Sequence, residues 1–243
     1  MSAVEDRRRE FDARGILIFD PEVPEELLDR IVTSLADKYV KTFSHGRLVA
    51  NPNRIQDAWW AVNEVRELAL WPAILRFVSE IYQAKPRAFQ TLNFPRGTQQ
   101  PIHSDTIHFN SKPGGQMCGI WVALENVQAT AGPLTYYPGS HKLPEYTMQD
   151  VGTPPGHEYY GKYEEFIANV IRERSMTPEY AEIRKGMAVL WAANLFHGGA
   201  AIVDRKATRH SQVTHYFFDG ATYYTPLMST PTHTHWRQPV WIH

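Results

Sequence analysis

Apolar residues at helical spacing predict that the first third of the chain is largely α-helical. The stretch 24–39 begins at a proline and repeats leucine or isoleucine every three or four residues, which predicts an amphipathic helix. The stretches 55–70 and 72–83 show the same periodicity and are separated at a proline, so two more helices are expected. Turn-forming residues predict a loop over 41–54. We therefore expect residues 1–85 to form a helical support.

The pattern changes at about residue 86 to short β-branched and aromatic runs separated by glycine and proline turns. These runs are not followed by regular crossover helices, which favours an antiparallel sandwich or barrel. The expected strands are 87–94, 118–127, 134–139, 186–194, 200–203 and 209–218. We therefore expect a mainly β core over residues 86–218.

A long segment, residues 144–182, interrupts the strands of this core. It begins rich in proline and glycine and is predicted to be helical after Tyr160. Long insertions between strands are often lids or substrate loops, and decoration of the surface is the alternative role. Residues 219–243 follow the core as a C-terminal extension. Because the sequence has no internal repeat and no low-complexity linker, one domain over residues 1–243 is the simplest expectation.

Composition and charge narrow the classes of function. With 43% hydrophobic and 21% charged residues, the chain can bury a full core. A net charge of −1 provides no basic field for a nucleic acid or an anionic membrane. Cys118 is the only cysteine, so no intrachain disulfide can form and a reducing compartment is expected. The charged N-terminus and the lack of an apolar run of roughly 18 residues lead us to expect a cytoplasmic protein.

Two histidines and an aspartate are candidate metal ligands. On an extended segment, residues i and i+2 face the same way, so His103 and Asp105 can present a nitrogen and an oxygen to one ion. By itself this short motif is weak. His197 ends an apolar strand and precedes two glycines, which allow a tight turn and a close approach to the imidazole. Two histidines and one carboxylate with open coordination positions form the facial triad of non-heme Fe(II) oxygenases.

The strand 209–218 carries a candidate anion site. Arg209, Ser211, Val213 and His215 alternate onto one face of the strand. An arginine on an interior face is costly unless it meets an anion, and its planar fork suits a carboxylate. The Ser211 hydroxyl can donate one further hydrogen bond.

These motifs, in this order, resemble the phytanoyl-CoA dioxygenase-like family of Fe(II)/2-oxoglutarate oxygenases. His103-Ser104-Asp105, the distant His197 and Arg209-His210-Ser211 resemble its metal and co-substrate motifs. The stretch "AGPLTYYPGSHK" at 131–142 resembles the family's segment after the first metal strand. The resemblance covers roughly residues 86–218, together with the helical N-terminal support.

The resemblance implies a fold and a set of roles. The fold is a double-stranded β-helix, which is a cupin-like jelly roll with the metal at its open mouth. His103, Asp105 and His197 would hold Fe(II), and Arg209 would bind the distal carboxylate of 2-oxoglutarate with help from Ser211. Arg209 lies one position further from His197 than is usual in relatives, so Arg205 competes for this role. Trp121 would line the co-substrate pocket. Gln90, on a strand face with Ala88, Leu92 and Phe94, would lie against 2-oxoglutarate.

The resemblance also implies a reaction, in which O₂ and 2-oxoglutarate are consumed and succinate and CO₂ are released. In related halogenases a small residue replaces the metal-binding carboxylate, whereas this chain retains Asp105. Hydroxylation of an unactivated C–H bond of a small-molecule substrate is therefore expected over halogenation. Two alternatives stay open at this point, namely a cupin-like metalloenzyme that does not use 2-oxoglutarate and a non-catalytic jelly-roll binding module. The sequence does not indicate the substrate's identity or the oligomeric state.

Overall fold

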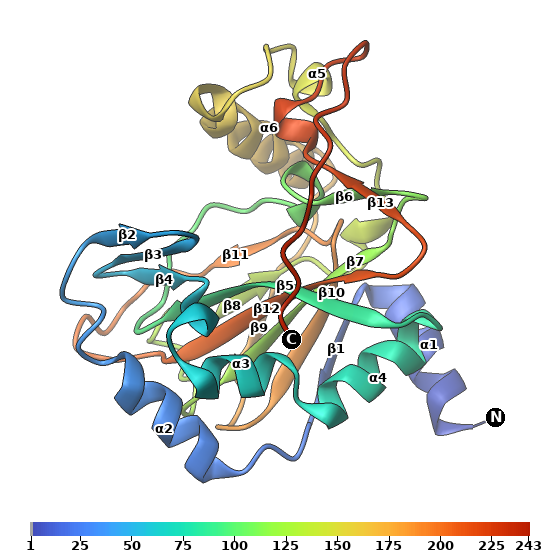
Figure 1. The fold of residues 1–243 in the computed structure, drawn as a ribbon. Helices are drawn as coiled ribbons and strands as arrows, with labels where there is room; N and C mark the ends of the chain where they lie inside the picture. Colours follow the sequence, from blue (N-terminus) through green and yellow to red (C-terminus); the bar gives the residue numbers. More distant parts are fainter. Residues whose placement is uncertain (1) are drawn as a thin grey trace.

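A large antiparallel sheet dominates the computed structural model, which describes residues 2–243 (Figure 1). Across these residues eight strands pair in the order β1, β10, β7, β12, β5, β4, β3, β2. Their bounds are β1 Ile16–Phe19, β2 Phe43–His45, β3 Leu48–Asn51, β4 Arg54–Gln56, β5 Pro86–Phe94, β7 Met117–Ala123, β10 Ala188–Ala192 and β12 Ser211–Phe218.

Two smaller sheets complete the β structure. The first pairs β11 (His197–Gly199) with β8 (Leu134–Tyr136), and β8 with β9 (Glu179–Ala181). The second pairs β13 (Thr222–Tyr224) with β6 (Asn110–Lys112). A mainly β fold with helical support is thereby confirmed.

The helices divide between two sides of the molecule. The N-terminal helices pack on one face of the large sheet, and α5 and α6 lie at the opposite end (Figure 1). Their bounds are α1 Ala3–Arg14, α2 Glu25–Leu35, α3 Asn63–Ala69, α4 Pro72–Tyr82, α5 Met148–Val151 and α6 Tyr160–Glu173. The helix predicted after Tyr160 is therefore present as α6. Among residues 2–243, no helix combines the length and the apolar character needed to cross a membrane.

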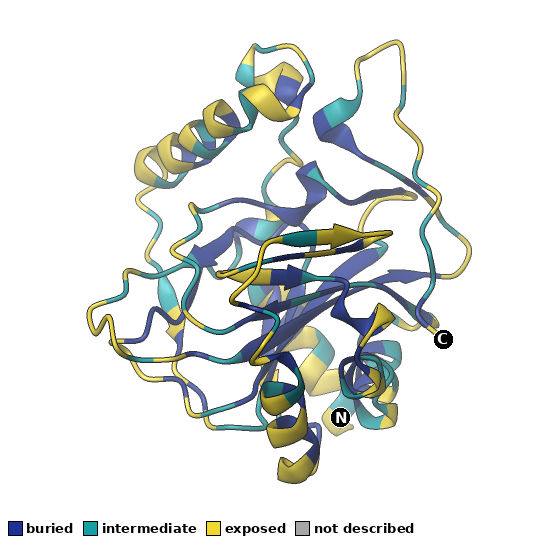
Figure 2. Ribbon diagram, turned by 60° about the vertical axis from the view of Figure 1, so that its left-hand side comes forward, coloured by how far each residue is buried: buried dark blue, intermediate teal, exposed yellow. Residues whose placement is uncertain are grey.

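Strand β12 shows how the sequence produces the layers. All of its residues are buried, and Figure 2 shows buried strands running through the centre of the molecule. Tyr216 and Phe218 pack with the N-terminal helices in one apolar core. Val213 packs on the other face, with Trp121 and Leu134, in a second core between the large and small sheets. Burial of both faces explains why aromatic and β-branched residues fill this strand.

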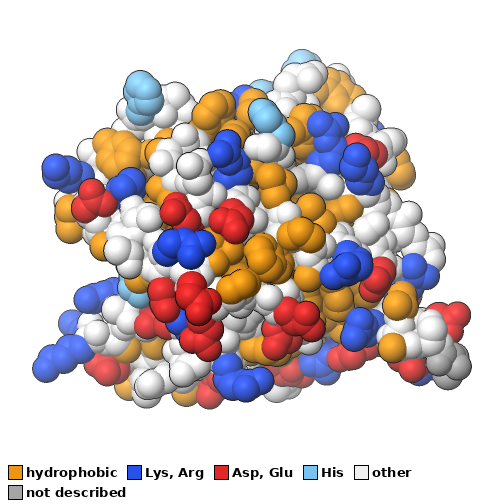
Figure 3. Space-filling view, turned by 60° about the horizontal axis from the view of Figure 1, so that its bottom comes forward, with side chains coloured by type: hydrophobic (Ala, Val, Ile, Leu, Met, Phe, Trp, Pro, Cys, Tyr) orange, Lys and Arg blue, Asp and Glu red, His pale blue; other side chains and the backbone are white. Residues whose placement is uncertain are grey.

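The surface shows no segregation of charge on the face drawn in Figure 3, where acidic and basic side chains are interspersed. This pattern agrees with the net charge of −1.

Three sequence-based expectations are wrong, two in the N-terminal half and one after His197. The expected loop over 41–54 contains β2, β3 and the start of β4, which extend the large sheet beyond β5. The helix expected over 55–70 begins only at Asn63, because its first residues complete β4 and a short 3₁₀ turn. The strand expected over 200–203 is instead β11, which starts at His197. Short strands of three or four residues leave too little alternation to be recognised in the sequence.

A β-bulge in β5 corrects one further expectation. His215 of β12 pairs with Gln90, but the next residue, Tyr216, pairs with Ala88, so Phe89 has no partner. The extra residue reverses the alternation of side chains along the strand. Ala88 therefore joins the helix-side core, and Gln90 faces the opposite side with Leu92.

Candidate functional site

Backbone pairing brings His103 and His197 side by side. The His103 amide donates to the His197 carbonyl oxygen at 2.9 Å, and the His197 amide donates to the His103 carbonyl oxygen at 2.9 Å. This isolated bridge replaces the strand expected at His103, because Asp105 already begins a 3₁₀ helix. Ser104 stays extended and caps that helix through its hydroxyl, so His103 and Asp105 still face the same way.

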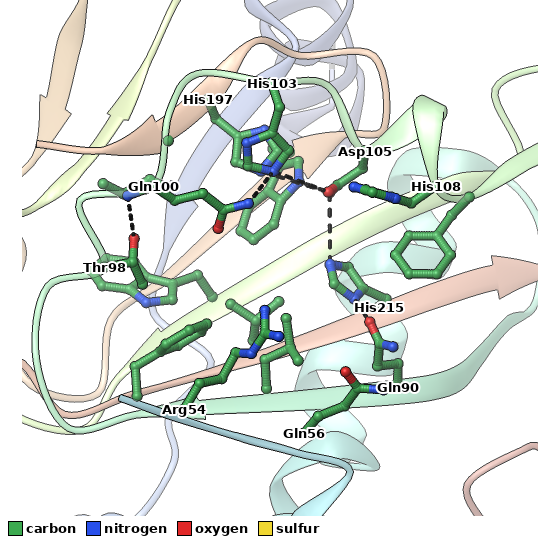
Figure 4. Close-up of a pocket in the computed structure, with 18 of the residues that line it drawn as sticks. Arg54, Gln56, Gln90, Thr98, Gln100, His103, Asp105, His108, His197 and His215 are labelled. Atoms are coloured by element: carbon green, nitrogen blue, oxygen red, sulfur yellow. Dashed lines mark hydrogen bonds and ion pairs between the residues drawn. The ribbon is translucent and has the colours of Figure 1, made fainter. Parts of the chain in front are cut away.

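The three expected metal ligands converge. One ligand atom from each of His103, Asp105 and His197 lies within 4.8 Å of the others. His103 Nε2 is 3.8 Å from Asp105 Oδ1, and His197 Nε2 is 3.8 Å from Asp105 Oδ2. Figure 4 shows the two imidazoles and the carboxylate pointing toward one another.

Each of the two imidazoles is hydrogen bonded through Nδ1, which leaves Nε2 as the atom that can bind a metal. Nδ1 of His103 lies 2.9 Å from the Pro101 carbonyl oxygen, and Nδ1 of His197 lies 2.9 Å from the Leu195 carbonyl oxygen. Because a carbonyl oxygen accepts, each Nδ1 carries the proton and each Nε2 lone pair faces the carboxylate. This is the arrangement that a metal-binding histidine requires.

The charges at the centre are suited to a cation. Burial, and after it the proximity of His197, lowers the pKa of His103 to about 3, so this imidazole is neutral. Burial acts to raise the pKa of Asp105, but the surrounding histidines and the hydrogen bond from Trp191 outweigh it and lower the pKa to about 2. An ionised carboxylate beside a neutral nitrogen donor gives this buried centre a negative charge that a cation would compensate. The donor set fits a divalent iron ion.

Trp191 of β10 orients the carboxylate. Its indole Nε1 donates to Asp105 Oδ2 at 2.8 Å. The indole lies against Gly119 of β7, where an added Cβ would stand 2.2 Å from two of its ring carbons. Gly119 is thus required for this close approach rather than for a turn.

A cavity of about 390 Å³ opens beside the triad. Of the residues predicted to bind co-substrate, Arg209, Trp121 and Gln90 line it. Ser211 lies fully buried on the same face of β12 as Val213, just outside the lining. Arg205 is exposed in a loop, so burial in the cavity distinguishes Arg209 from its competitor.

Arg209 has unused hydrogen-bonding capacity. It is 3% exposed, and its guanidinium carbon lies 5.2 Å from the centre of the Trp121 ring. Its Nε and the Ser211 hydroxyl are both buried without a partner among the described residues. Burial lowers the pKa of Arg209 to about 10, which leaves it charged at neutral pH. A buried cation beside an unsatisfied hydroxyl fits the carboxylate of a ligand.

Other residues of the site are not apparent from the sequence. His215 Nε2 lies 3.7 Å from Asp105 Oδ2, and its Nδ1 lies 3.0 Å from Gln90 Oε1. His215 shares a strand face with Arg209, which is the only signal that places it here. His157 and Tyr160 of the 144–182 insert also line the cavity, although their sequence context has no motif.

Comparisons with known proteins agree with this geometry. Residues 52–211 match the sequence model of the family described as phytanoyl-CoA dioxygenase (PhyH). A Danio rerio protein named phytanoyl-CoA dioxygenase domain-containing protein 1 is 30% identical over 134 residues, covering 54% of this chain and 43% of the relative. A Caenorhabditis elegans protein named probable phytanoyl-CoA dioxygenase is 22% identical over 227 residues, covering 81% of this chain and 70% of the relative. The matched region therefore spans less than half of the Danio rerio protein.

Solved structures share the fold at low identity. SnoN from nogalamycin biosynthesis, described as a non-heme alpha ketoglutarate dependent epimerase, has a TM-score of 0.69 at 19% identity, covering 91% of this chain and 85% of SnoN. EctD from S. alaskensis with bound Fe has a TM-score of 0.71 at 15% identity, covering 100% of this chain and 86% of EctD. The expected jelly-roll fold is thus confirmed. Since the family match extends over more than half of the sequence, the chain belongs to the phytanoyl-CoA dioxygenase (PhyH) family.

Proposed function

We propose that this protein is an Fe(II)- and 2-oxoglutarate-dependent dioxygenase that hydroxylates an unactivated C–H bond of a small molecule. The observation that carries the proposal is the buried convergence of His103, Asp105 and His197 beside a cavity lined by Arg209, whose Nε has no partner among residues 2–243. When bound, iron and 2-oxoglutarate supply the oxidising chemistry, in which O₂ is consumed and succinate and CO₂ are released.

The protein's part at the metal is to hold three donors in fixed orientations. The Pro101 and Leu195 carbonyl oxygens keep each Nε2 lone pair directed inward. Trp191 donates to Asp105 Oδ2 and so holds the orientation of the carboxylate that would bind the ion. Three donors on one side leave the remaining positions open to ligands.

The protein would also bind the dicarboxylate 2-oxoglutarate in a single orientation. Arg209 would bind the carboxylate furthest from the metal, and the Ser211 hydroxyl would donate to the same group. Trp121 would form the wall of that subsite, against which the guanidinium already lies. Gln90 would act at the opposite end, where its amide oxygen holds His215.

Hydroxylation is the reaction that the ligand set favours. Asp105 is retained and occupies the place that a halide would need, which argues against halogenation. SnoN and SnoK are described as an epimerase and a carbocyclase, and an EctD structure as holding 2-oxoglutarate and 5-hydroxyectoine. Proteins that share this fold are thus described with different reactions, so the reaction of this protein must be tested directly.

The 144–182 insert would cover the cavity within one domain over residues 1–243. His157 and Tyr160 reach the cavity from this insert, which supports a role next to the substrate. We also propose that the protein acts in the cytoplasm, since its single cysteine is buried and free.

The experiment is an anaerobic titration of the Fe(II)-loaded protein with 2-oxoglutarate, monitored for the visible metal-to-ligand charge-transfer band. The band should appear in the wild type and disappear in His103→Ala and Asp105→Ala, which should also form no succinate in air. Arg205→Ala, on the exposed loop, is the matched control and should retain both. A cupin-like enzyme without 2-oxoglutarate, or a binding module, would give no band, and full turnover by Asp105→Ala would refute the ligand assignment.

A further inference from the structure

A second, smaller cavity of about 170 Å³ adjoins the catalytic one. Gln56 of β4 and Gln90 of β5 line both cavities and form the boundary between them. Both side chains are amides, so they can hydrogen bond to a ligand on either side. Figure 4 shows the two glutamines next to each other, on the side of His215 away from the two iron-binding histidines. The two cavities therefore share a wall that is made in part by these two side chains.

Two arginines line this second cavity. Arg47 lies in the exposed turn between β2 and β3, and Arg237 comes from the C-terminal extension. Arg237 donates through Nη1 to Thr225 Oγ1 at 3.1 Å, and its guanidinium carbon lies 4.7 Å from the centre of the Phe109 ring. Phe109 itself lines the catalytic cavity. The guanidinium of Arg237 is thus fixed in place between the two cavities.

The hydrogen-bonding capacity of Arg237 is not exhausted by these contacts. Its Nε is buried and has no partner among residues 2–243. Among these described residues, no carboxylate lies within salt-bridge distance of Arg237 or Arg47. An unsatisfied buried donor on a cation indicates a missing acceptor, and an oxyanion is the acceptor that a guanidinium fits best.

Asp57 is the acidic residue in the lining of this cavity. Its single charge does not neutralise both Arg47 and Arg237. Asp57 Oδ1 already accepts hydrogen bonds from the Thr91 amide at 3.0 Å and from Trp59 Nε1 at 3.3 Å. One carboxylate against two guanidinium groups leaves the cavity with a net positive charge. Burial has the largest effect on the pKa of Arg237 and lowers it. The like charge of Arg47 lowers it further, whereas Asp57 raises it. An anion placed between the two arginines would relieve their repulsion.

We propose that this second cavity is a binding site for an oxyanion, such as a carboxylate or a phosphate, and that the anionic group belongs to the substrate. Assigning the group to a substrate rests on the proposed function, whereas binding of the oxyanion does not. The substrate is then a small, polar, anionic molecule that places its reactive carbon beside His215 and its charge between Arg47 and Arg237. The second cavity, with about 170 Å³ and a lining that includes two arginines, three glutamines and an aspartate, is too small and too polar for a long acyl chain.

Binding is tested with sulfate as the probe. Sodium sulfate is titrated calorimetrically, at constant ionic strength, into Fe(II)-loaded protein saturated with 2-oxoglutarate, which occupies the site at Arg209. We expect affinity to fall at least 10-fold in Arg47→Gln and Arg237→Gln, and to stay unchanged in Arg205→Gln. Because Arg47 lies in an exposed turn, its variant tests the site even if Arg237→Gln fails to fold. Absence of sulfate binding in the wild type, or equal affinity in Arg47→Gln and Arg205→Gln, overturns the proposal.

A second arm identifies the source of the anion. Small carboxylic acids and phosphonates, each paired with a neutral amide or ester, are screened for stimulation of succinate release. If the anion belongs to the substrate, stimulating acids outperform their neutral partners, sulfate competes with them, and their KM rises in Arg47→Gln. Sulfate binding without a stimulating acid, or without competition, assigns the cavity to a free oxyanion and overturns the substrate assignment. The charge-transfer band is recorded for each protein, because its absence from the wild type refutes the proposed function without affecting sulfate binding.

Discussion

The indole of Trp191 and the carboxylate of Asp105 are joined by a buried hydrogen bond of 2.8 Å from Nε1 to Oδ2. The bond crosses from the large sheet to the 3₁₀ turn that follows His103. It fixes the orientation of the carboxylate beside His103 and His197. Outer hydrogen bonds of this kind tune a metal site, and their loss costs roughly 10- to 100-fold in metal affinity or activity.

We predict that Trp191→Phe binds Fe(II) roughly 10- to 100-fold more weakly than the wild type. The phenyl ring fills most of the space but cannot donate to Asp105. Equilibrium binding of Fe(II) under anaerobic conditions measures the change. Trp60→Phe, at an exposed tryptophan, is the control and should bind normally. Equal affinities in the two variants would show that the hydrogen bond has no role at the metal.

Arg209→Ala should raise the KM for 2-oxoglutarate by roughly 10- to 100-fold, because hydrogen bonds to a charged group contribute about 1.5–3 kcal/mol. The maximal rate at saturating 2-oxoglutarate should change less. Ser211→Ala should have a smaller effect in the same direction, without loss of stability in the ligand-free protein, since its hydroxyl has no partner there. Initial rates of succinate release measure both. A KM unchanged in Arg209→Ala would remove this residue from the co-substrate site.

Gly119→Ala should destabilise the protein by about 1–3 kcal/mol, because overpacking a closely fitted core forces side chains or backbone to move. The new methyl would displace the Trp191 indole, so Fe(II) binding should weaken as well. Gly161→Ala is the matched control, since this position in α6 has open space around it and alanine favours helices. Urea unfolding measures both variants. Equal stability of the two would contradict the packing argument.

Asp57→Asn should stabilise the protein at neutral pH and not in acid. Burial is the largest effect on the pKa of Asp57 and raises it above its ordinary value. The folded state therefore binds this proton more tightly than the unfolded state, and stability falls as pH rises from about 4, the unfolded pKa, through the folded pKa. Asparagine keeps the oxygen that accepts from Thr91 but does not ionise.

The free energy of unfolding of wild type and Asp57→Asn, compared between pH 4 and pH 7, tests this sign. The advantage of the variant should grow with pH. Asp204→Asn, at an exposed aspartate that accepts from the Lys206 amide, is the matched control. An advantage of Asp57→Asn that shrinks with rising pH would contradict the assignment.

The proposed metal ligands and Arg209 are predictable from the sequence because each stands in a local pattern that has a chemical meaning. His103 and Asp105 are spaced for one face of an extended segment, His197 precedes two glycines, and Arg209 is a charge on an interior face. The long strands and α4 can also be predicted from the sequence, since their periodicity extends over enough residues to be recognised.

The parts that the sequence does not reveal depend on contacts between distant segments. Trp191 reaches Asp105 only because Gly119 on the neighbouring strand makes room for its indole. Arg237 has no motif around it, and its place beside Phe109 follows from the path of the C-terminal extension. Strands β2 to β4 are too short for their alternation to outweigh the turn residues among them.

The unpaired residue Phe89 has a consequence for comparing this chain with its relatives. Downstream of it, every side chain of β5 points to the side opposite to the one that continuous alternation from Ala88 predicts. A relative with one residue fewer at this position would present a different set of amino acids to its ligand, even if the two aligned sequences looked alike. Deleting Phe89 would therefore redirect several side chains of β5 at once, and alignments should be gapped there before pocket residues are transferred.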